Sequence, residues 1–188
     1  MIIGNGLLAS EFSDLENNNT IVIFASGVSN SLEETHSAFE REKNLIIDTI
    51  NNKKHSLFVY FSTCSITDKT VNKRPYVLHK LNMEKLIRNS SNNYLIIRLP
   101  NIVGKGGNEN TIFNYLVNAI KNNQKISIWK NANRNILDIK DMGEIVRNVI
   151  KSGYKNTILN IANLNSYLVT DIVDKIENYL QKKANINL

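Results

Sequence analysis

The first residues whose spacing suits a chemical task form a glycine-containing turn near the start of the chain. Gly4-Asn5-Gly6-Leu7-Leu8-Ala9 follows the apolar run Met1-Ile2-Ile3 and opens a stretch of helical spacing that ends near Phe12. The first glycine permits a sharp turn, the second lets the backbone approach a pyrophosphate, and Ala9 lets helix and strand pack closely. Free N–H groups at the start of a helix also favour phosphate oxygens. The turn predicts a dinucleotide-binding site, although tight strand-to-helix turns without a ligand use glycine as well.

A tyrosine and a lysine one helical turn apart form the second pattern. Tyr76 and Lys80 stand at positions i and i+4 of a predicted helix, so their side chains share one face. The ammonium group of Lys80 would favour the ionised phenol of Tyr76, which makes that phenol a usable proton donor or acceptor near neutral pH. A pair on a solvated helix face gives the same spacing. We expect His79 to lie on the helix surface rather than to act in catalysis.

Hydroxyl side chains at the end of a predicted buried strand form the third pattern. Ser62-Thr63-Cys64-Ser65 follows the apolar run at 57–61. Parallel sheets place their ligands at this carboxyl edge, so a hydroxyl here would hold a substrate carbonyl or hydroxyl beside Tyr76. Cys64 has no obvious base to activate its thiol, and we expect it to form part of the pocket wall.

These residues need a scaffold, and the apolar pattern predicts one. Strands are expected at 1–3, 20–24, 57–61, 94–99, 125–129, 135–138 and 157–161. Helices are expected after the glycine turn and at 31–52, 76–88, 111–121, 141–151 and 170–181, the second opened by a capping box of Ser31 and Glu34. Buried strands that alternate with helices indicate an α/β fold with a Rossmann-like parallel sheet covered on both faces.

Composition limits the class of protein. The chain has 188 residues, which favours one domain, and its single cysteine rules out an internal disulfide framework. No Cys/His cluster has metal-binding spacing, and no apolar run approaches the roughly 20 residues of a membrane span. Without a signal peptide we expect a cytoplasmic protein with no metal and no membrane partner. The net charge of +6 is scattered and lacks interleaved exposed aromatics, so no nucleic-acid partner is expected.

Taken in order, these motifs resemble the extended short-chain dehydrogenases/reductases, which include nucleotide-sugar epimerases, dehydratases and reductases. The similarity covers nearly the whole chain. It is carried by the glycine turn, Phe24-Ala25-Ser26-Gly27, Phe61-Ser62-Thr63, the helix from Pro75 to Leu86, Arg98-Leu99-Pro100-Asn101-Ile102-Val103-Gly104 and the segment from Arg134 to Met142.

The resemblance implies an NAD or NADP cofactor, hydride transfer at a sugar carbon and a nucleotide-sugar substrate. Tyr76 would exchange the proton of the carbinol oxygen with the help of Thr63, while Lys80 would lower the pKa of Tyr76 and hold the nicotinamide ribose. The implied cofactor-binding residues are Gly4, Asn5, Gly6, Leu7, Leu8, Ala25, Ser26, Gly27, Ser62, Lys80 and Pro100. The implied substrate-binding residues are Cys64, Ser65, Asn101 and Arg134.

The chain is shorter than the family pattern in two places. Two strand-helix units are missing between the glycine turn and the strand at 20–24, so no residue reads the adenosine ribose and the sequence does not distinguish NAD from NADP. The C-terminal substrate lobe is also truncated. We expect a single NAD(P)-binding domain over 1–188, to which 101–140 and 157–188 contribute a minimal substrate lobe.

These features predict a minimal nucleotide-sugar reductase or epimerase, acting in surface-polysaccharide biosynthesis. Dehydration is not expected, because Cys64 and Ser65 stand where the dehydratases carry an Asp-Glu pair. The alternative is a non-catalytic scaffold or sensor that binds NAD(P) or a nucleotide sugar on the same fold. The helices at 32–52 and 76–88 correspond to those that pair family dimers, so a homodimer is expected.

Overall fold

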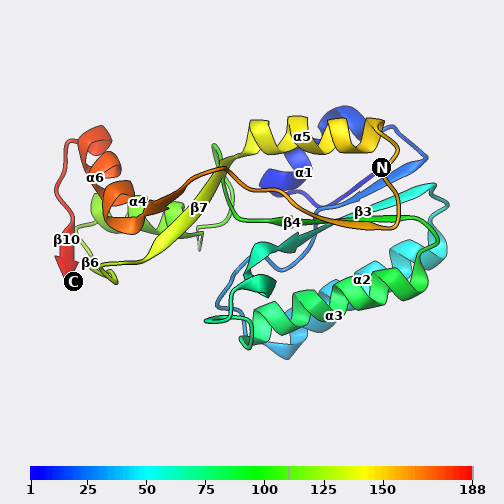
Figure 1. The fold of residues 1–188 in the computed structure, drawn as a ribbon, viewed down its shortest axis with the longest axis horizontal. Coiled ribbons are helices and arrows are strands. Elements are labelled where there is room, and N and C mark those ends of the chain that lie inside the picture. The colour runs from blue at the N-terminus through cyan, green and yellow to red at the C-terminus, as the bar shows by residue number, and fades with distance from the viewer. Residues whose placement is uncertain (110, 188) are drawn as a thin grey trace.

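A computed structural model, which describes residues 1–109 and 111–187, shows a parallel sheet between two layers of helices and a smaller unit at one end of it (Figure 1). The sheet has the order β1-β2-β3-β4-β8, and every adjacent pair is parallel. Its strands are β1 (Ile2–Ile3), β2 (Ile21–Phe24), β3 (Leu57–Thr63), β4 (Tyr94–Leu99) and β8 (Thr157–Asn160). The predicted α/β fold with a Rossmann-like sheet is confirmed.

Helices cover both faces of this sheet (Figure 1). α1 (Leu7–Glu11) and α5 (Ile139–Lys151) lie on one face, and α2 (His36–Asn52) and α3 (Pro75–Ser90) lie on the other. Each layer encloses its own apolar core. The first contains Phe12, Val59, Ile97, Met142 and Val146, and the second contains Ile46, Phe58, Tyr60, Ile87 and Ile96. Because the β3 side chains alternate between the two cores, the whole strand is buried.

The smaller unit has a separate apolar core. It consists of β5 (Asn101–Val103), α4 (Ile112–Lys121), β6 (Lys125–Ser127), β7 (Asn133–Asp138), β9 (Ser166–Leu168), α6 (Val169–Leu180) and β10 (Asn185–Asn187). Its strands form the arrays β5-β7-β9 and β6-β10, and its core contains Leu116, Ile120, Ile126, Val173 and Ile176. β8 belongs to the large sheet, so the predicted lobe boundary at residue 157 lies too early in the chain.

The smaller unit is joined to the large sheet by short connections. Only Pro100 separates β4 from β5. β7 passes directly into α5, because Asp138, the last residue of the strand, caps the helix by accepting a 2.7 Å hydrogen bond from the Lys140 N–H. The loop at 161–165 is a longer connection, between β8 and β9.

The start of α2 differs from the prediction. The helix begins at His36 after the N-cap residue Thr35, so Ser31 and Glu34 form no capping box. The carboxylate of Glu33 instead accepts hydrogen bonds from the Thr35 N–H at 3.0 Å and the Thr35 hydroxyl at 2.6 Å. This local turn competes with the helix and delays its first residue.

The connection between β1 and β2 is short. α1, the 3-10 helix Ser13–Leu15 and a polar loop connect β1 to β2. β1 is therefore an edge strand that pairs with β2 alone within the described chain. The amino group of Met1 donates hydrogen bonds to the carbonyls of Leu15, Asn18 and Ile21, which draws this loop around the strand. No helix in the described ranges combines the length and apolar character needed to cross a membrane.

Candidate active site

The glycine turn lies exposed at the carboxyl end of β1. Gly4 has φ +130°, a conformation that favours glycine, and a Cβ built there would lie 2.5 Å from the carbonyl oxygen of Ala25. Gly4 is therefore needed for the close approach of β1 and the loop after β2. A Cβ on Gly6 would meet no atom within 4 Å. The exposed backbone at Gly4, Asn5 and Gly6 is thus open to a ligand.

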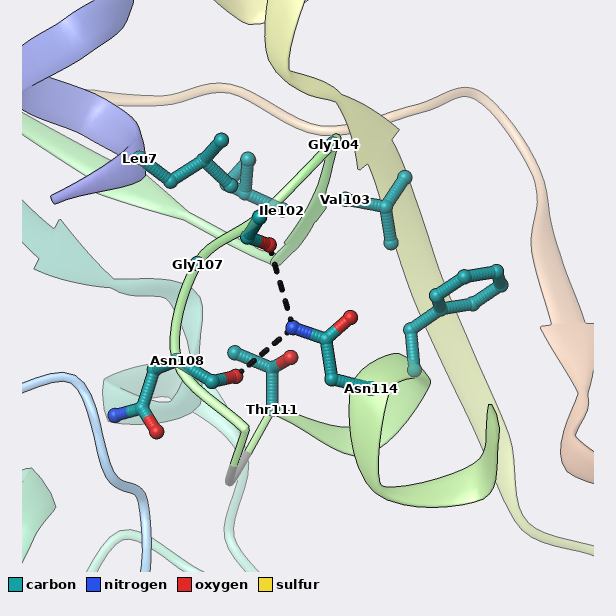
Figure 2. A pocket seen from close by; sticks show the side chains of 10 residues that line it. Leu7, Ile102, Val103, Gly104, Gly107, Asn108, Thr111 and Asn114 are labelled. Atoms are coloured by element: carbon teal, nitrogen blue, oxygen red, sulfur yellow. Dashed lines mark hydrogen bonds between the residues drawn. The ribbon is translucent and has the colours of Figure 1, made fainter. Parts of the chain in front are cut away.

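A small pocket lies beside this turn and is lined by residues of α1 and of the smaller unit (Figure 2). The Leu7 side chain faces the segment after β5, where a Cβ on Gly107 would lie 3.3 Å from Leu7 Cδ2. Asn114 Nδ2 holds this segment by donating to the carbonyls of Gly106 at 3.4 Å and Asn108 at 3.0 Å. Asn108 Nδ2 in turn donates to Ser29 Oγ at 2.8 Å. The segment at 104–109 therefore links the smaller unit to the loop after β2.

The side chains of Thr63 and Tyr76 form a hydrogen bond with each other. Thr63 is the last residue of β3 and Tyr76 the second residue of α3, and both side chains are buried. Burial raises the pKa of Tyr76 above its ordinary value, although the charge of Lys80 and a hydrogen bond with Thr63 lower it. The expected influence of Lys80 is present. Burial outweighs it, so the phenol of Tyr76 is held in its protonated form.

The ammonium group of Lys80 is bound to a buried carboxylate that the sequence analysis did not identify. Lys80 Nζ donates to Glu42 Oε1 at 3.0 Å and to the Tyr60 hydroxyl at 3.2 Å. Glu42 is fully buried on α2, and it also accepts from the Tyr60 hydroxyl at 2.6 Å and the Val28 N–H at 2.7 Å. Burial alone would raise the pKa of Glu42, but the Lys80 charge and the surrounding donors lower it to about 2.

His79 belongs to the same cluster and is not on the helix surface, which corrects the sequence-based expectation. It is buried, its ring stacks on Phe39 with 4.5 Å between centroids, and its Nε2 lies 3.0 Å from Glu42 Oε2. Gly27 covers the cluster, since a Cβ there would lie 2.5 Å from Lys80 Nζ. Lys80 is therefore enclosed rather than open toward the glycine turn.

The remaining predicted cofactor residues have different surroundings. Ala25, Ser26 and Gly27 form the loop beside Gly4, and the exposed Arg41 donates to the Ser26 carbonyl at 2.9 Å. Leu7 and Leu8 pack at the edge of the first core, and Pro100 lies half-buried between β4 and β5. The structure therefore brings most of the predicted cofactor residues together around the turn.

Ser62 faces α3 and contributes to a second buried network. Its hydroxyl donates to Glu84 Oε1 at 2.6 Å. Arg98 on β4 also binds Glu84, donating to its two carboxylate oxygens at 2.9 and 2.7 Å. The Ser62 hydroxyl is thus engaged in a bond that holds α3 on the sheet.

The predicted substrate residues are less concentrated. Cys64 and Ser65 follow Thr63 in the 3-10 helix Cys64–Thr67, and burial raises the pKa of the Cys64 thiol. Asn101 Nδ2 donates to the Asn135 carbonyl at 2.9 Å and so ties β5 to β7. Arg134 is exposed on β7.

Arg134 nevertheless lies near the loop that joins Thr63 to Tyr76. Hydrogen bonds from Thr70, followed by the charges of Arg134 and Arg74, lower the pKa of Asp68 in that loop. The charge of Arg134 therefore reaches the loop that joins Thr63 to Tyr76.

The sequence contains a signal for Glu42 in the spacing of the α2 residues. The buried residues of α2 are Glu42, Ile46 and Thr49, which follow helical spacing. A carboxylate in an apolar stripe indicates a buried ion pair, because an unpaired charge is rarely buried. Tyr60, within the apolar β3 run, carries the same kind of signal.

Comparison with known proteins gives a family and a set of similar folds. The family model described as "NAD dependent epimerase/dehydratase family" matches residues 10–162. No curated protein sequence matches the chain significantly.

Solved structures resemble the chain at low sequence identity. UDP-glucuronic acid 4-epimerase from Bacillus cereus, in complex with UDP-glucuronic acid and NAD, has a TM-score of 0.73 and 16% identity over 97% of this chain. This chain spans 66% of the length of that epimerase. A dTDP-4-dehydrorhamnose reductase from Clostridium acetobutylicum has a TM-score of 0.76 and 16% identity, covering 99% of this chain and 81% of its own. RMD from Pseudomonas aeruginosa, complexed with NADPH, has a TM-score of 0.74 and 15% identity. The match covers 98% of this chain and 73% of the RMD chain.

The two turn glycines should respond differently to alanine. Gly4→Ala places a methyl group against the Ala25 carbonyl and should lower the free energy of unfolding by about 2 kcal/mol or more, measured by urea denaturation. Gly6→Ala meets open space and should cost less than about 1 kcal/mol. If Gly6 approaches a pyrophosphate, Gly6→Ala should weaken NAD or NADP binding in calorimetry. Equal loss of stability in the two variants would contradict this assignment.

The buried Glu42 carboxylate should make stability depend on pH. Its pKa falls from 4.5 to about 2 on folding, so its stabilisation is complete above 4.5 and is lost as the pH falls toward 2. Glu42→Gln should lower the unfolding free energy at neutral pH by about 3 kcal/mol, and this difference from the wild type should shrink below pH 4.5. The exposed Glu34→Gln is the control and should change stability by less than about 0.5 kcal/mol. A difference that stays constant with pH would contradict the prediction.

Proposed function

The chain belongs to the NAD-dependent epimerase/dehydratase family, and we propose that it is an NAD(P)-dependent oxidoreductase or epimerase that acts on a nucleotide-linked sugar. The observation that carries this proposal is the cluster of Thr63, Tyr76 and Lys80 at the carboxyl edge of the sheet. A hydroxyl, a phenol and an ammonium group within one electrostatic network are suited to moving a proton at a carbinol oxygen.

The residues at the glycine turn fit a dinucleotide. The exposed Gly4–Gly6 backbone would hold the pyrophosphate, with the Ala25–Gly27 loop beside it. The Arg41 guanidinium, next to Ser26, adds a positive charge near phosphate. When bound, the cofactor supplies or accepts the hydride at the sugar carbon.

The residues of this chain provide the proton. Tyr76 is protonated at neutral pH, so its hydroxyl donates to a carbonyl oxygen in reduction and takes the proton back in oxidation. Thr63 hydrogen-bonds with Tyr76 and orients this hydroxyl. The nearby Arg134 would bind the diphosphate of the substrate through its guanidinium group.

Reduction or epimerisation suits these groups better than dehydration. Elimination of water needs an additional acid-base pair next to the catalytic hydroxyl. Ser65 has no titratable group, and burial raises the pKa of the Cys64 thiol, which disfavours the thiolate. We propose the product serves surface-polysaccharide biosynthesis in the cytoplasm.

A second function rests on the enclosure of Lys80. Its ammonium group is bound to Glu42 under Gly27, and the chain lacks the family's adenosine-binding units. These features favour a non-catalytic scaffold or sensor that binds NAD(P) or a nucleotide sugar. Calorimetry with NAD, NADP and nucleotide sugars, combined with the turnover assay below, separates the two. Binding without turnover would support the sensor.

Replacement of the Tyr76 hydroxyl should abolish turnover. NADH or NADPH is mixed with dTDP-, UDP- and GDP-linked keto-sugars, and loss of nicotinamide absorbance is followed. Tyr76→Phe should lower kcat by about 100-fold or more, because no other group donates the proton at that place. Tyr154→Phe, at an exposed tyrosine, is the matched control and should retain full activity. Undiminished turnover by Tyr76→Phe would rule out the mechanism.

We propose a homodimer formed through α2 and α3. Light scattering should give twice the chain mass of 21.4 kDa. Leu78 is 46% exposed on α3, so Leu78→Glu should convert the dimer to a monomer by placing a charge in the interface. Leu164→Glu, at a fully exposed leucine in the loop between β8 and β9, should leave the mass unchanged. A monomer mass for the unaltered protein would refute the dimer.

A further inference from the structure

The Glu42 carboxylate has a role in the site that the proton-transfer scheme does not include. Its two oxygens receive donors from separate parts of the fold: Lys80 Nζ and the Tyr60 hydroxyl on Oε1, and the Val28 N–H and His79 Nε2 on Oε2. No solvent reaches the carboxylate. A carboxylate with all its partners in place is fixed in position, and so is the ammonium group that it binds.

We infer that Glu42 is a positioning residue that draws the charge of Lys80 away from Tyr76 and so poises the site to donate a proton to a carbonyl oxygen. This inference rests on the proposed function and refines it toward reduction. Glu42 is fully buried, so it would act on a ligand only through Lys80.

Charge balance gives the direction of the effect. With Glu42 ionised, Lys80 protonated and Tyr76 neutral, the three groups carry no net charge. Release of a proton from the Lys80–Tyr76 pair then leaves a buried negative charge, which is unfavourable. Without the Glu42 charge, the same release leaves the pair neutral and becomes easier. The first proton of the pair is affected in this way whether Lys80 or Tyr76 loses it.

Three other ionisable groups, Tyr60, Glu84 and His79, pack around the pair. Tyr60 on β3 is neutral, because burial and Glu42 raise its pKa well above the ordinary value. On α3, Glu84 is neutralised by Arg98 from β4 at 2.7 Å. His79 on α3 approaches the far oxygen of Glu42, 3.0 Å away. Glu42 is therefore the carboxylate whose negative charge acts directly on Lys80.

A protonated Tyr76 selects one direction of the chemistry. Reduction adds a hydride from NAD(P)H to the carbonyl carbon and a proton from the Tyr76 hydroxyl to the carbonyl oxygen. The cofactor is oxidised to NAD(P)+, and solvent returns the proton to the phenolate. An epimerase that starts from an alcohol must first oxidise it. This oxidation requires the Lys80–Tyr76 pair to have lost a proton. The Glu42 network therefore favours a keto-sugar reductase over an epimerase.

The test measures the pH at which the Lys80–Tyr76 pair loses its first proton. The full chain is labelled with ¹³C at tyrosine Cζ and ¹⁵N at lysine Nζ and titrated by NMR, with Tyr76→Phe and Lys80→Met assigning the signals. Glu42→Gln should lower this pH by about one unit or more. Glu42→Asp keeps the negative charge, so this variant should fold. Its carboxylate lies one methylene farther from Lys80, so the pH of the first proton loss should fall by a smaller amount.

Glu177→Gln is the matched control. Glu177 is a buried carboxylate paired with Lys183 at 2.6 Å, but it lies in the smaller unit, so the pair should titrate as in the wild type. An equal shift in this control would overturn the inference, and so would an unchanged titration in Glu42→Gln. If Glu42→Gln does not fold, an unchanged titration in Glu42→Asp overturns it.

An activity measurement separates this inference from the proposed function. With a keto-sugar that the protein reduces, the pH for half-maximal alcohol oxidation should fall in Glu42→Gln by the same amount as the NMR titration. An NMR shift without turnover of any nucleotide keto-sugar would support the role of Glu42 and overturn the proposed function. Turnover with unchanged pH profiles would support the proposed function and overturn the role of Glu42.

Discussion

The burial of β3 on both faces is the constraint from which the rest of the architecture follows. Every residue of this strand is buried, between β2 and β4 in the sheet and between two helical layers. A strand without a solvent-facing side requires helices above and below, and parallel neighbours require their carboxyl ends to meet at one edge. This edge brings Thr63, the loop after Phe24 and the start of β5 together. The candidate site therefore lies where the carboxyl ends of these parallel strands meet.

Two buried carboxylates then fix α2 and α3 against this apolar sheet. A charge in such a core is tolerated only when donors surround it, and both Glu42 and Glu84 meet this condition. Glu84 joins α3 to β3 and β4, and Glu42 joins α2 to the residues that carry the proposed chemistry. The hydrogen bonds of Glu84 require one orientation of α3 about its own axis. Apolar packing is less directional and would restrict this orientation less.

The sequence predicted the scaffold better than the environment of the catalytic groups. β4 agrees with its predicted range at both ends because its largely apolar run begins after Asn93 and ends before Pro100, which has no backbone N–H to continue the strand. α2 starts later than predicted because Glu33 binds Thr35, a local competition that propensity does not resolve. Periodicity shows that Tyr76 and Lys80 share a helix face, but not that Glu42, distant in sequence, binds Lys80. The pKa of Tyr76 depends on that contact and on burial, so it required the three-dimensional structure.

The short connections between the large sheet and the smaller unit limit how the two can move. Domain closure around a ligand is usually absorbed by a few loop residues that change φ and ψ freely. Here β4 leads into β5 through Pro100, whose ring fixes φ, and Asp138 is at once the end of β7 and the cap of α5. Neither connection offers a flexible hinge. The loop at 161–165 is the longest of the three connections, and the two short ones would hold the large sheet and the smaller unit in nearly one arrangement when a ligand binds.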